Sequence, residues 1–359
     1  MKAIFYLPVK KKYTDLWEYY QADLEVLQEL FDEVVVCRSV IDFFKEYHRA
    51  KLIYAWWWNR SLPVILICKI LRIKVITTGA IHMLDLSGGR DFVNSSFLYK
   101  VAVRLSLRLS DCNLFISKDQ YYAVTSHLRV QNPRLLYPCL KKNTNRDPAA
   151  IFQLKKVIQS KRNDPTIPLF ATIVWHTPTQ FQRKGVWETM RALANLKGCS
   201  AGPFRWVIAG KSEGFEGLFK AEIKKLNLSD QVFLLTDPSH DEKNNLLAAA
   251  DLYIQPSWCE GFGNAVLEAM SHGTSCLVSR YTAQPESVGP DGWIVTEITA
   301  EAIAKQLFDF ISASSLEKEK NSIRALQRAH SLFSFERRVN ELNSILRGIG
   351  IETLLARKV

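Results

Sequence analysis

The chain has 359 residues, of which 47% are hydrophobic, and its formal net charge is +11 at pH 7. A chain of this length is expected to form two domains, each large enough to bury its own core. No uninterrupted apolar stretch approaches the roughly 18 residues that a membrane-spanning helix requires, which excludes that class of protein. The longest apolar stretch, residues 62–76, is broken by three basic residues and is interpreted as a core helix that runs into a strand.

The N-terminus does not resemble a secretory signal. Lys2 precedes a short apolar run, and lysines follow where a cleavage site would be expected. The seven cysteines are scattered, odd in number and without C-x-x-C spacing, which predicts buried, reduced thiols. Cys259 has no histidine near it in the sequence and is interpreted as a packing residue. These features predict a cytoplasmic protein.

Strand-like and helix-like runs alternate through the first half of the chain. Strands are expected at 2–7, 34–37, 52–56, 74–78, 113–118 and 134–138, with helices over 22–31, over 41–49 and after Pro63. Alternation of this kind predicts a doubly wound parallel sheet.

The composition becomes polar after Leu140 and the strand-helix alternation restarts at IPLFATIVW. We therefore predict a first domain over 1–140, a boundary segment over 141–165, a second domain over 166–334 and a helical C-terminal segment over 335–359. The fold class is α/β with two domains.

A glycine-broken turn follows a short apolar strand near the end of the second domain. The strand is expected at 252–254, and the next helix is expected to begin near Asn264 and to end at Gly273. The amide groups of Phe262, Gly263 and Asn264 would then point out of a helix N-terminus, where the macrodipole favours an anion such as a diphosphate.

Two carboxylates, Glu260 and Glu268, flank this expected anion site. Alone they would repel a phosphate, but carboxylates accept strong hydrogen bonds from sugar hydroxyls. A nucleotide sugar combines both chemical features and satisfies the whole turn. The alternative is that both glutamates are solvated and that the glycines form an ordinary strand-to-helix turn.

The segment EGFGNAVLEAMSHGTSCLVS at 260–279 resembles the donor-site signature of family 4 retaining glycosyltransferases. The resemblance extends over residues 165–300 and includes Lys184-Gly185, the strand WVIAG ending at Gly210, and QPESVGPDGWIV at 284–295. It implies the GT-B fold, in which two Rossmann-like domains face each other across a cleft and a C-terminal helix crosses back to the first domain. The N-terminal domain would then bind the acceptor and the C-terminal domain the donor.

The resemblance also implies roles for individual residues. Glu268 would bind the donor ribose, Glu260 would contact the transferred sugar, and Lys184 would neutralise the leaving diphosphate. The turn from Gly261 to Asn264, with Gly210, would complete the donor site. The chain has no D-x-D sequence, so no metal or other cofactor is expected.

Two segments depart from the family pattern. Val174-Trp175-His176 stands where the family usually has glycine-arginine, and Arg183 is the residue that we expect to supply the missing charge. LPVKKKYTDLW at 7–17 replaces the paired glycines of the N-terminal loop.

Histidines follow two of the expected strands. His82 stands where the resembled family often places a histidine against the transferred sugar, with Thr78 and Gly79 on the same rim. His176 is the weaker candidate at the second strand end, and Asp85 would orient His82 or bind an acceptor hydroxyl. The competing interpretation is that each histidine is structural.

Basic residues gather in the first domain. Lys100, Arg104 and Arg108 repeat at helical spacing beside leucines, and Lys10, Lys11 and Lys12 lie near Tyr13 and Trp17. Such segments can bind an anionic membrane surface. The alternative is a solvated face on a core helix, and no nucleic-acid motif occurs.

Together these features predict a retaining, metal-independent glycosyltransferase that moves a hexose from a nucleotide-diphosphate sugar to an acceptor hydroxyl. The acceptor would be a lipid, a lipid-linked glycan or a soluble metabolite. Alternatives are a nucleotide-sugar 2-epimerase or a phosphorylase on the same fold, and a non-catalytic subunit that binds sugar nucleotides or membranes.

Overall fold

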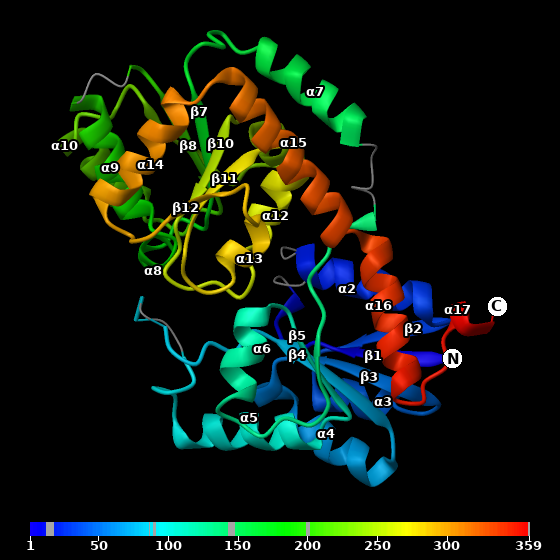
Figure 1. Ribbon diagram of the computed structural model, residues 1–359. Coiled ribbons are helices and arrows are strands. Elements are labelled where there is room, and N and C mark those ends of the chain that lie inside the picture. Colours follow the sequence, from blue (N-terminus) through cyan, green and yellow to red (C-terminus); the bar gives the residue numbers. More distant parts are fainter. Residues whose placement is uncertain (12–17, 86, 89–90, 143–147, 199–201, 358–359) are drawn as a thin grey trace. The chain divides into compact units, whose positions relative to one another are not determined.

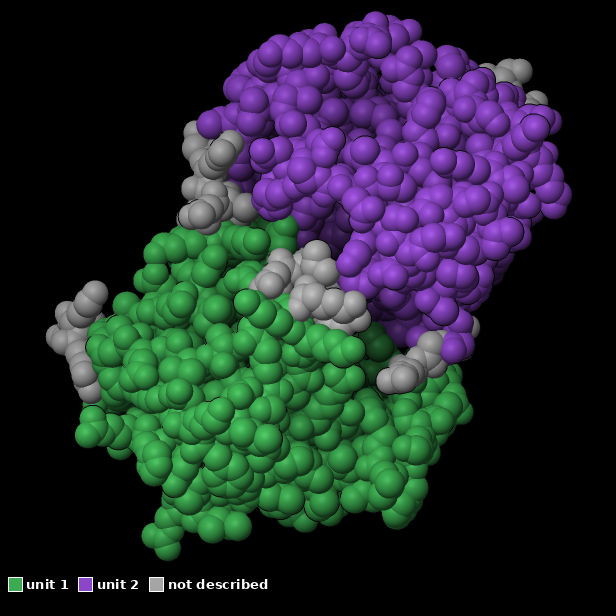
Figure 2. All heavy atoms as spheres, turned by 180° about the vertical axis from the view of Figure 1, so that it is seen from behind, with its two compact units in different colours: residues 1–84, 90–145, 332–359 green, residues 85–89, 146–331 purple. Residues whose placement is uncertain are grey.

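The computed structural model describes the chain except for residues 12–17, 86, 89–90, 143–147, 199–201 and 358–359. The chain forms two compact units, which Figure 2 distinguishes by colour. Unit 1 comprises residues 1–84, 90–145 and 332–359, and unit 2 comprises residues 85–89 and 146–331. The last segment of the chain therefore returns to the unit that the first segment builds.

Unit 1 contains a six-stranded sheet in the order β2-β1-β3-β4-β5-β6, with every neighbouring pair parallel (Figure 1). Its strands are β1 (Lys2–Tyr6), β2 (Glu33–Cys37), β3 (Ala50–Trp56), β4 (Lys74–Gly79), β5 (Cys112–Phe115) and β6 (Pro133–Leu135). Its helices are α2 (Glu18–Leu30), α3 (Val40–Glu46), α4 (Trp58–Leu71), α5 (Phe97–Leu109), α6 (Lys118–Thr125), α16 (Phe335–Gly348) and α17 (Leu354–Arg357).

Both faces of this sheet are covered. Phe5 and its neighbours pack with α2 and α16, whereas Ile4 and its neighbours pack with α3 and α4. Strands that are buried on both faces contain nearly continuous apolar runs, as β1 and β3 do. The predicted doubly wound parallel sheet is confirmed.

The apolar stretch 62–76 forms the end of α4 and the start of β4, as the sequence predicted. In the part of the chain that the structure describes, no helix is long and apolar enough to cross a membrane.

Unit 2 repeats the design with a second parallel sheet in the order β12-β11-β10-β7-β8-β9. Its strands are β7 (Leu169–Ile173), β8 (Arg205–Gly210), β9 (Val232–Thr236), β10 (Leu252–Gln255), β11 (Ser275–Ser279) and β12 (Trp293–Val295). Its helices are α7 (Pro148–Ser160), α8 (Pro178–Arg183), α9 (Val186–Gly198), α10 (Glu216–Lys225), α11 (His240–Ala249), α12 (Asn264–Ser271), α13 (Gln284–Val288), α14 (Ala300–Ser312) and α15 (Ser315–Leu332). The two-sheet α/β architecture predicted from the sequence is thus confirmed.

Helix α7 lies in the polar segment that the sequence indicated as a boundary, yet it packs within unit 2. Lys155 is buried, and its ammonium group donates hydrogen bonds to the carbonyls of Ala248 and Ala250 and to the Thr274 hydroxyl, at 3.0, 2.7 and 2.8 Å. Burial lowers the pKa of Lys155 to about 7. A residue that appears solvated in the sequence therefore anchors α7 to unit 2.

A buried ion pair joins the two ends of the chain inside unit 1. On α16, Arg338 donates to Oδ1 of Asp23 on α2, from Nε at 2.9 Å and from Nη2 at 2.6 Å. The second carboxylate oxygen accepts from the Tyr54 hydroxyl and the Trp56 indole, both at 3.0 Å. Both oxygens of this buried carboxylate are thus satisfied.

We predict that Arg338→Met destabilises unit 1 by about 3–5 kcal/mol, because it leaves the Asp23 carboxylate buried without its cation. Arg347→Met, at an exposed position of the same helix, should change stability by less than about 0.5 kcal/mol. Chemical denaturation measures both. Adding Asp23→Asn to Arg338→Met should restore part of the loss, since the amide oxygen still accepts a hydrogen bond. A double variant as unstable as the single one would contradict this role of the buried charge.

Candidate functional site

The glycine-broken turn of unit 2 has the geometry that the sequence predicted. It follows β10, and α12 begins at Asn264 after Gly263, whose φ of 89° lies in the left-handed region that favours glycine. Gly273 beyond the helix also has a positive φ, 69°. Gly263, the N-cap residue, has no side chain that could accept hydrogen bonds from the first amide groups of α12, which favours an anion at this helix N-terminus.

Glu260 lies at the mouth of this turn with two cations beside it. Its Oε1 is 3.0 Å from Nη1 of Arg183 and 3.9 Å from Nζ of Lys184. The Gln255 amide also donates to this oxygen, at 3.1 Å. The structure therefore brings Arg183 and Lys184 to Glu260, although they precede it by 77 and 76 residues in the sequence. Gln255, at the end of β10, joins them.

Lys184 is held at the carboxyl ends of β7 and β10. Its ammonium group donates to the Ile173 carbonyl at 3.1 Å and to Oε1 of Gln255 at 3.0 Å, and the Tyr253 hydroxyl donates to the same Gln255 oxygen at 2.7 Å. Burial lowers the pKa of Lys184 to about 8; the Glu260 carboxylate opposes this shift and the Arg183 cation adds to it. Lys184 is therefore fixed in position and can gain or lose its proton near neutral pH.

Gly185 makes this placement sterically feasible. Its φ is +66°, and a Cβ atom at this position would lie 2.3 Å from the Pro256 carbonyl oxygen. No other residue type fits both constraints. Gly210 is similarly enclosed, since a Cβ there would lie 1.7 Å from the Val174 carbonyl oxygen. This contact gives Gly210 a packing role, and its proposed donor role stays a prediction.

Glu268 pairs with a lysine that the sequence did not indicate. Nζ of Lys243, on α11, lies 2.9 Å from Oε2 of Glu268, on α12, and both side chains are partly buried. Ser239 and Glu242 form a capping box that fixes the start of α11 one turn before Lys243. The pairing depends on the packing of α11 near α12, and no local sequence signal reveals it.

The two histidine candidates differ in accessibility. His176 is enclosed: its Nδ1 is 3.4 Å from Oε1 of Glu216, and its ring packs against Phe181. Burial lowers its pKa, which favours the neutral ring. His176 is thus a buried residue among packing neighbours, and a role for it in the site stays a prediction.

His82 is half-buried beyond β4 in unit 1, and its carbonyl accepts a hydrogen bond from the Phe92 amide at 2.7 Å. The nearby Thr78 hydroxyl donates to the Leu114 carbonyl, and Asp85 in unit 2 accepts hydrogen bonds from Ser87. The role of His82 toward a transferred sugar stays a prediction.

Two further predictions from the sequence concern the state of the cysteines and the absence of a bound metal. The six described cysteines, Cys259 among them, are buried thiols outside any disulfide, as the sequence predicted. Among the described residues no three His, Cys, Asp or Glu side chains are arranged to hold a metal ion. Metal independence itself stays a prediction.

Residues 159–328 match the family described as "Glycosyl transferases group 1". A segment of 70 residues is 44% identical to the MMP alpha-(1->4)-mannosyltransferase of Mycolicibacterium hassiacum and covers 20% of this chain and 17% of that protein. A segment of 192 residues is 29% identical to the GDP-mannose-dependent alpha-(1-6)-phosphatidylinositol dimannoside mannosyltransferase of Mycobacterium tuberculosis and covers 50% of this chain and 47% of that protein. The matched segments thus span less than half of each of these two relatives.

Two solved structures share the fold over nearly the whole chain. HepE from Anabaena, solved in complex with UDP, has a TM-score of 0.76 at 16% identity, covering 97% of this chain and 100% of that one. Sucrose-phosphate synthase from Thermosynechococcus elongatus has a TM-score of 0.73 at 16% identity, covering 97% and 98%. The fold predicted from the sequence is confirmed by these structures, and residues 159–328 resemble the group 1 glycosyltransferases; placement in family 4 stays a prediction.

We predict that Glu268→Ala weakens nucleotide-sugar binding about tenfold or more, because it removes charge-assisted hydrogen bonds worth about 1.5–3 kcal/mol. Lys243→Met should weaken binding to a smaller extent, since Lys243 orients the Glu268 carboxylate, and Lys243→Arg should retain most of the affinity. Calorimetric titration of all three variants and of the Glu268→Ala/Lys243→Met double variant measures the coupling.

If Lys243 acts through Glu268, the double variant binds no more weakly than Glu268→Ala alone. Strictly additive losses would show that the two residues contact the ligand independently. Tighter binding by Lys243→Met would show that Lys243 masks the carboxylate instead of orienting it.

Proposed function

We propose that this chain, whose residues 159–328 match the group 1 glycosyltransferases, is a GT-B glycosyltransferase that transfers a hexose from a nucleotide-diphosphate sugar to an acceptor hydroxyl. We further propose that it retains the anomeric configuration and needs no metal ion. The arrangement of Glu260, Arg183 and Lys184 beside the uncapped start of α12 is the observation that supports this function.

The chemistry of the turn suits a ligand that is anionic in one part and hydroxyl-rich in another. The amide groups at the start of α12 and the cations of Arg183 and Lys184 favour the diphosphate. The carboxylates of Glu260 and Glu268 favour the hydroxyls of the transferred sugar and the ribose. Three cations, with Lys243 included, stand against two carboxylates, so the diphosphate enters a site whose carboxylates are already compensated.

In the proposed reaction the bond between the anomeric carbon and the diphosphate oxygen breaks, and its electron pair stays on that oxygen. Lys184 and Arg183 stabilise the resulting charge, as preorganised cations do where charge develops in a transition state. The acceptor hydroxyl attacks the anomeric carbon from the same face, and its proton passes to the departing phosphate oxygen. The products are the glycoside and the nucleoside diphosphate.

The names of related proteins guide the choice of substrates. HepE was solved with UDP, and the Mycobacterium tuberculosis relative is named for GDP-mannose and a phosphatidylinositol dimannoside. We therefore propose a UDP- or GDP-hexose donor and a glycan or lipid-linked acceptor for this chain. The cytoplasmic location expected from the sequence stays a prediction.

Two alternatives share the site and differ in products. An epimerase would convert the donor without an acceptor, and a non-catalytic subunit would bind the donor unchanged. The departure at Val174-Trp175-His176, of which Val174 and His176 are buried, is the feature that favours the second alternative. Product analysis separates all three.

The test begins with a thermal-shift panel of UDP-, GDP- and ADP-hexoses, because a ligand that binds the folded state raises the melting temperature. The best donor is then incubated alone, with and without EDTA, and the released sugar is followed by NMR. Slow donor hydrolysis that survives EDTA and first yields the donor's own anomer supports the proposal. An epimerised donor, an inverted anomer or loss of activity in EDTA would each overturn a stated part of it.

We predict that donor affinity falls as the pH rises above about 8. Burial lowers the pKa of Lys184 to about 8, and a bound diphosphate raises it, so binding above pH 8 requires uptake of a proton. The affinity should fall by up to about tenfold per pH unit and stay level below pH 7. Calorimetric titration from pH 6.5 to 9.5 measures this dependence.

Two variants isolate the group that titrates. Lys184→Arg keeps its charge at every pH used and should bind with little pH dependence. Lys184→Met should also lose the dependence and should bind more weakly at pH 7. A wild-type affinity that does not change between pH 7 and 9 would remove Lys184 from the diphosphate site.

A further inference from the structure

Helix α5 in unit 1 exposes apolar side chains that the protein core does not take up. Its inner face, with Val103, Ser106 and Leu107, is buried. On the outer face, Phe97 is 75% exposed and Leu98 is 78% exposed, and Leu105 follows at 36%. A helix that only covers a sheet would place polar residues at these positions.

The apolar surface continues into the loop before the helix. Val93 is 52% exposed, and its amide donates to the Met83 carbonyl at 3.1 Å. This hydrogen bond places Val93 near Leu84, the residue after Met83, which is 55% exposed. Val93 also precedes Phe97 by four residues. The N-terminal end of α5 and its preceding loop thus form an exposed apolar tip, here defined as Leu84, Val93, Phe97 and Leu98.

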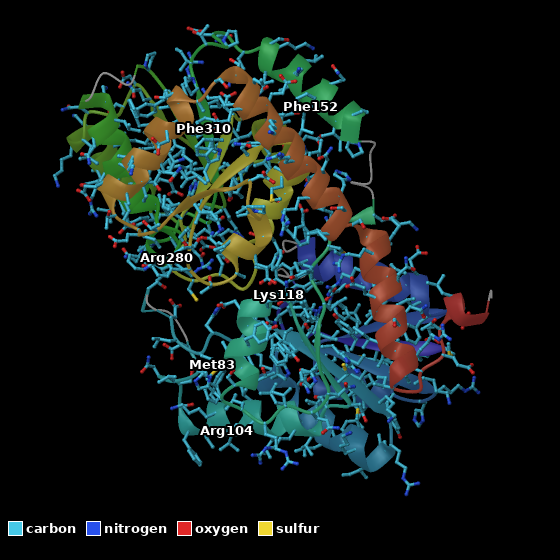
Figure 3. The ribbon with its side chains drawn as sticks, in the orientation of Figure 1. Met83, Arg104, Lys118, Phe152, Arg280 and Phe310 are labelled. Atoms are coloured by element: carbon cyan, nitrogen blue, oxygen red, sulfur yellow. The ribbon has the colours of Figure 1, made fainter. Side chains whose placement is uncertain are left out.

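Basic residues follow this apolar tip along the same outer face. Lys100, Arg104 and Arg108 repeat every four residues, and both arginines are exposed. Figure 3 labels Arg104 on α5, where its guanidinium group lies 5.3 Å from the centre of the Phe92 ring. These three residues are called the basic stripe below.

Among the described residues, no ion pair joins the basic stripe to an acidic side chain. The sequence from Phe92 to Ser110 contains no Asp or Glu, and Asp91 just before it is buried and bonded to Asn94. Asp111, just after it, is paired with Lys69 and Lys74, at 3.1 and 3.3 Å. The outer face of α5 therefore carries a surplus of positive charge.

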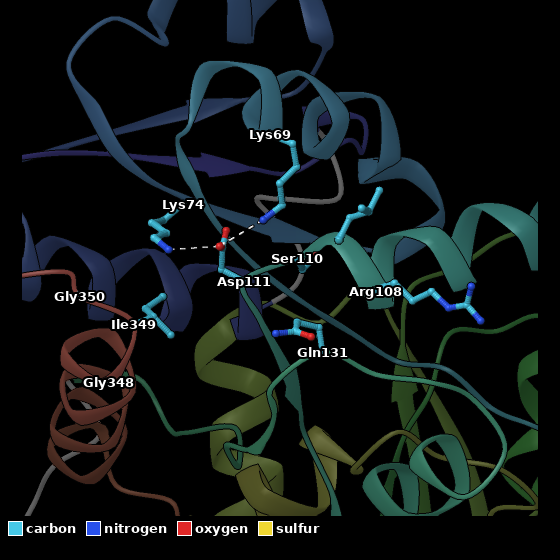
Figure 4. Close-up of a pocket in the computed structure, with 10 residues that line it drawn as sticks. Lys69, Lys74, Arg108, Ser110, Asp111, Gln131, Gly348, Ile349 and Gly350 are labelled. Atoms are coloured by element: carbon cyan, nitrogen blue, oxygen red, sulfur yellow. Dashed lines mark hydrogen bonds and ion pairs between the residues drawn. The ribbon is translucent and has the colours of Figure 1, made fainter.

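A pocket of about 640 Å³ adjoins the C-terminal end of α5 and extends this charge. Lys69, Lys74 and Arg108 line it together with Asp111 (Figure 4). Two lysines share the single carboxylate, and Figure 4 shows the Arg108 side chain extending away from Asp111. Cations therefore outnumber carboxylates in this pocket by three to one.

Exposed apolar side chains that are bordered by cations fit the boundary of an anionic bilayer. The apolar groups enter the region between headgroups and acyl chains, while Lys and Arg bind the anionic headgroups. A protein partner would also accept apolar groups, but the unneutralised basic residues along the whole helix favour a surface of negative charge.

We propose that the outer face of α5, comprising the apolar tip and the basic stripe, is a docking surface for anionic lipid bilayers. This docking proposal extends the proposed function and rests on it in one respect. A docked enzyme would be held where a lipid-linked acceptor is presented. Docking itself requires no sugar donor, so it can be tested separately from catalysis.

The experiment is co-sedimentation of the protein, without donor, with vesicles of phosphatidylcholine alone or mixed with phosphatidylglycerol. We expect binding to the mixed vesicles at low salt, weaker binding at high salt because the screening length shortens, and little binding to phosphatidylcholine alone. Equal binding to both kinds of vesicle, or no binding to the mixed vesicles at low salt, would overturn the proposal.

Two variants test the two parts of the surface. Lys100→Gln, Arg104→Gln and Arg108→Gln together should weaken binding on the order of a hundredfold, since each basic residue contributes about a factor of five. Phe97→Ser with Leu98→Ser should also weaken binding, and the remaining binding should be more sensitive to salt. Wild-type binding by either variant would exclude that part of the surface.

Helix α10 in unit 2 supplies matched controls. It exposes Leu218, at 68%, and the exposed lysines Lys220, Lys224 and Lys225. Changing these three lysines to Gln removes the same charge, and Leu218→Ser removes a comparable apolar group. Both control variants should bind vesicles almost as the wild type does, and an equal loss of binding would show that only net charge or general hydrophobicity matters.

Two further measurements control for misfolding and for self-association of the protein. Thermal unfolding should be unchanged in all these variants, which would show that they fold. The donor-induced thermal shift should also be unchanged, which would separate a loss of docking from a loss of the donor site. Light scattering without vesicles tests for self-association. A dimer that Phe97→Ser with Leu98→Ser abolishes would assign the surface to a second copy of the chain and overturn the lipid proposal.

Discussion

The candidate site depends on the close approach of two backbone segments in unit 2. Gly185 lies so near the Pro256 carbonyl that a Cβ atom would be 2.3 Å from its oxygen, and its φ is also positive. Because β7 and β10 are neighbours in a parallel sheet, their carboxyl ends meet at one edge, and this approach is what sets Lys184 beside Glu260. The other charged groups of the site are arranged around that contact.

Charge compensation follows from this geometry. Each of the two glutamates has a cation within hydrogen-bonding distance: Arg183 for Glu260 and Lys243 for Glu268. Paired carboxylates repel an incoming diphosphate less than free ones, and they remain able to accept hydrogen bonds from hydroxyls. Lys184 donates its hydrogen bonds to neutral groups, the Ile173 carbonyl and the Gln255 amide. A bound anion therefore raises the pKa of Lys184 and increases the fraction that is protonated.

The sequence revealed the local parts of this site and missed the pairings between distant parts. Apolar runs and glycines were sufficient for β10, for the turn and for the start of α12 at Asn264, because these depend on neighbours in the chain. The pair between Lys243 and Glu268 depends on how α11 packs, and periodicity carries no such information. His176 was the weaker candidate at a strand end, and its enclosure by Phe181 and Glu216 was not evident from the sequence.

The C-terminal segment shows the same limit on a larger scale. Its helical pattern was evident, but Arg338 resembles any charged residue of an amphipathic helix until Asp23, 315 positions earlier, is placed beside it. The core of unit 1 also includes Phe335, Val339 and Leu342 from this helix. Unit 1 therefore cannot complete its core until α16 has been synthesised, whereas residues 146–331 provide the core cluster of unit 2 before that point. The order of segments along the chain thus makes the second unit the first that can finish folding.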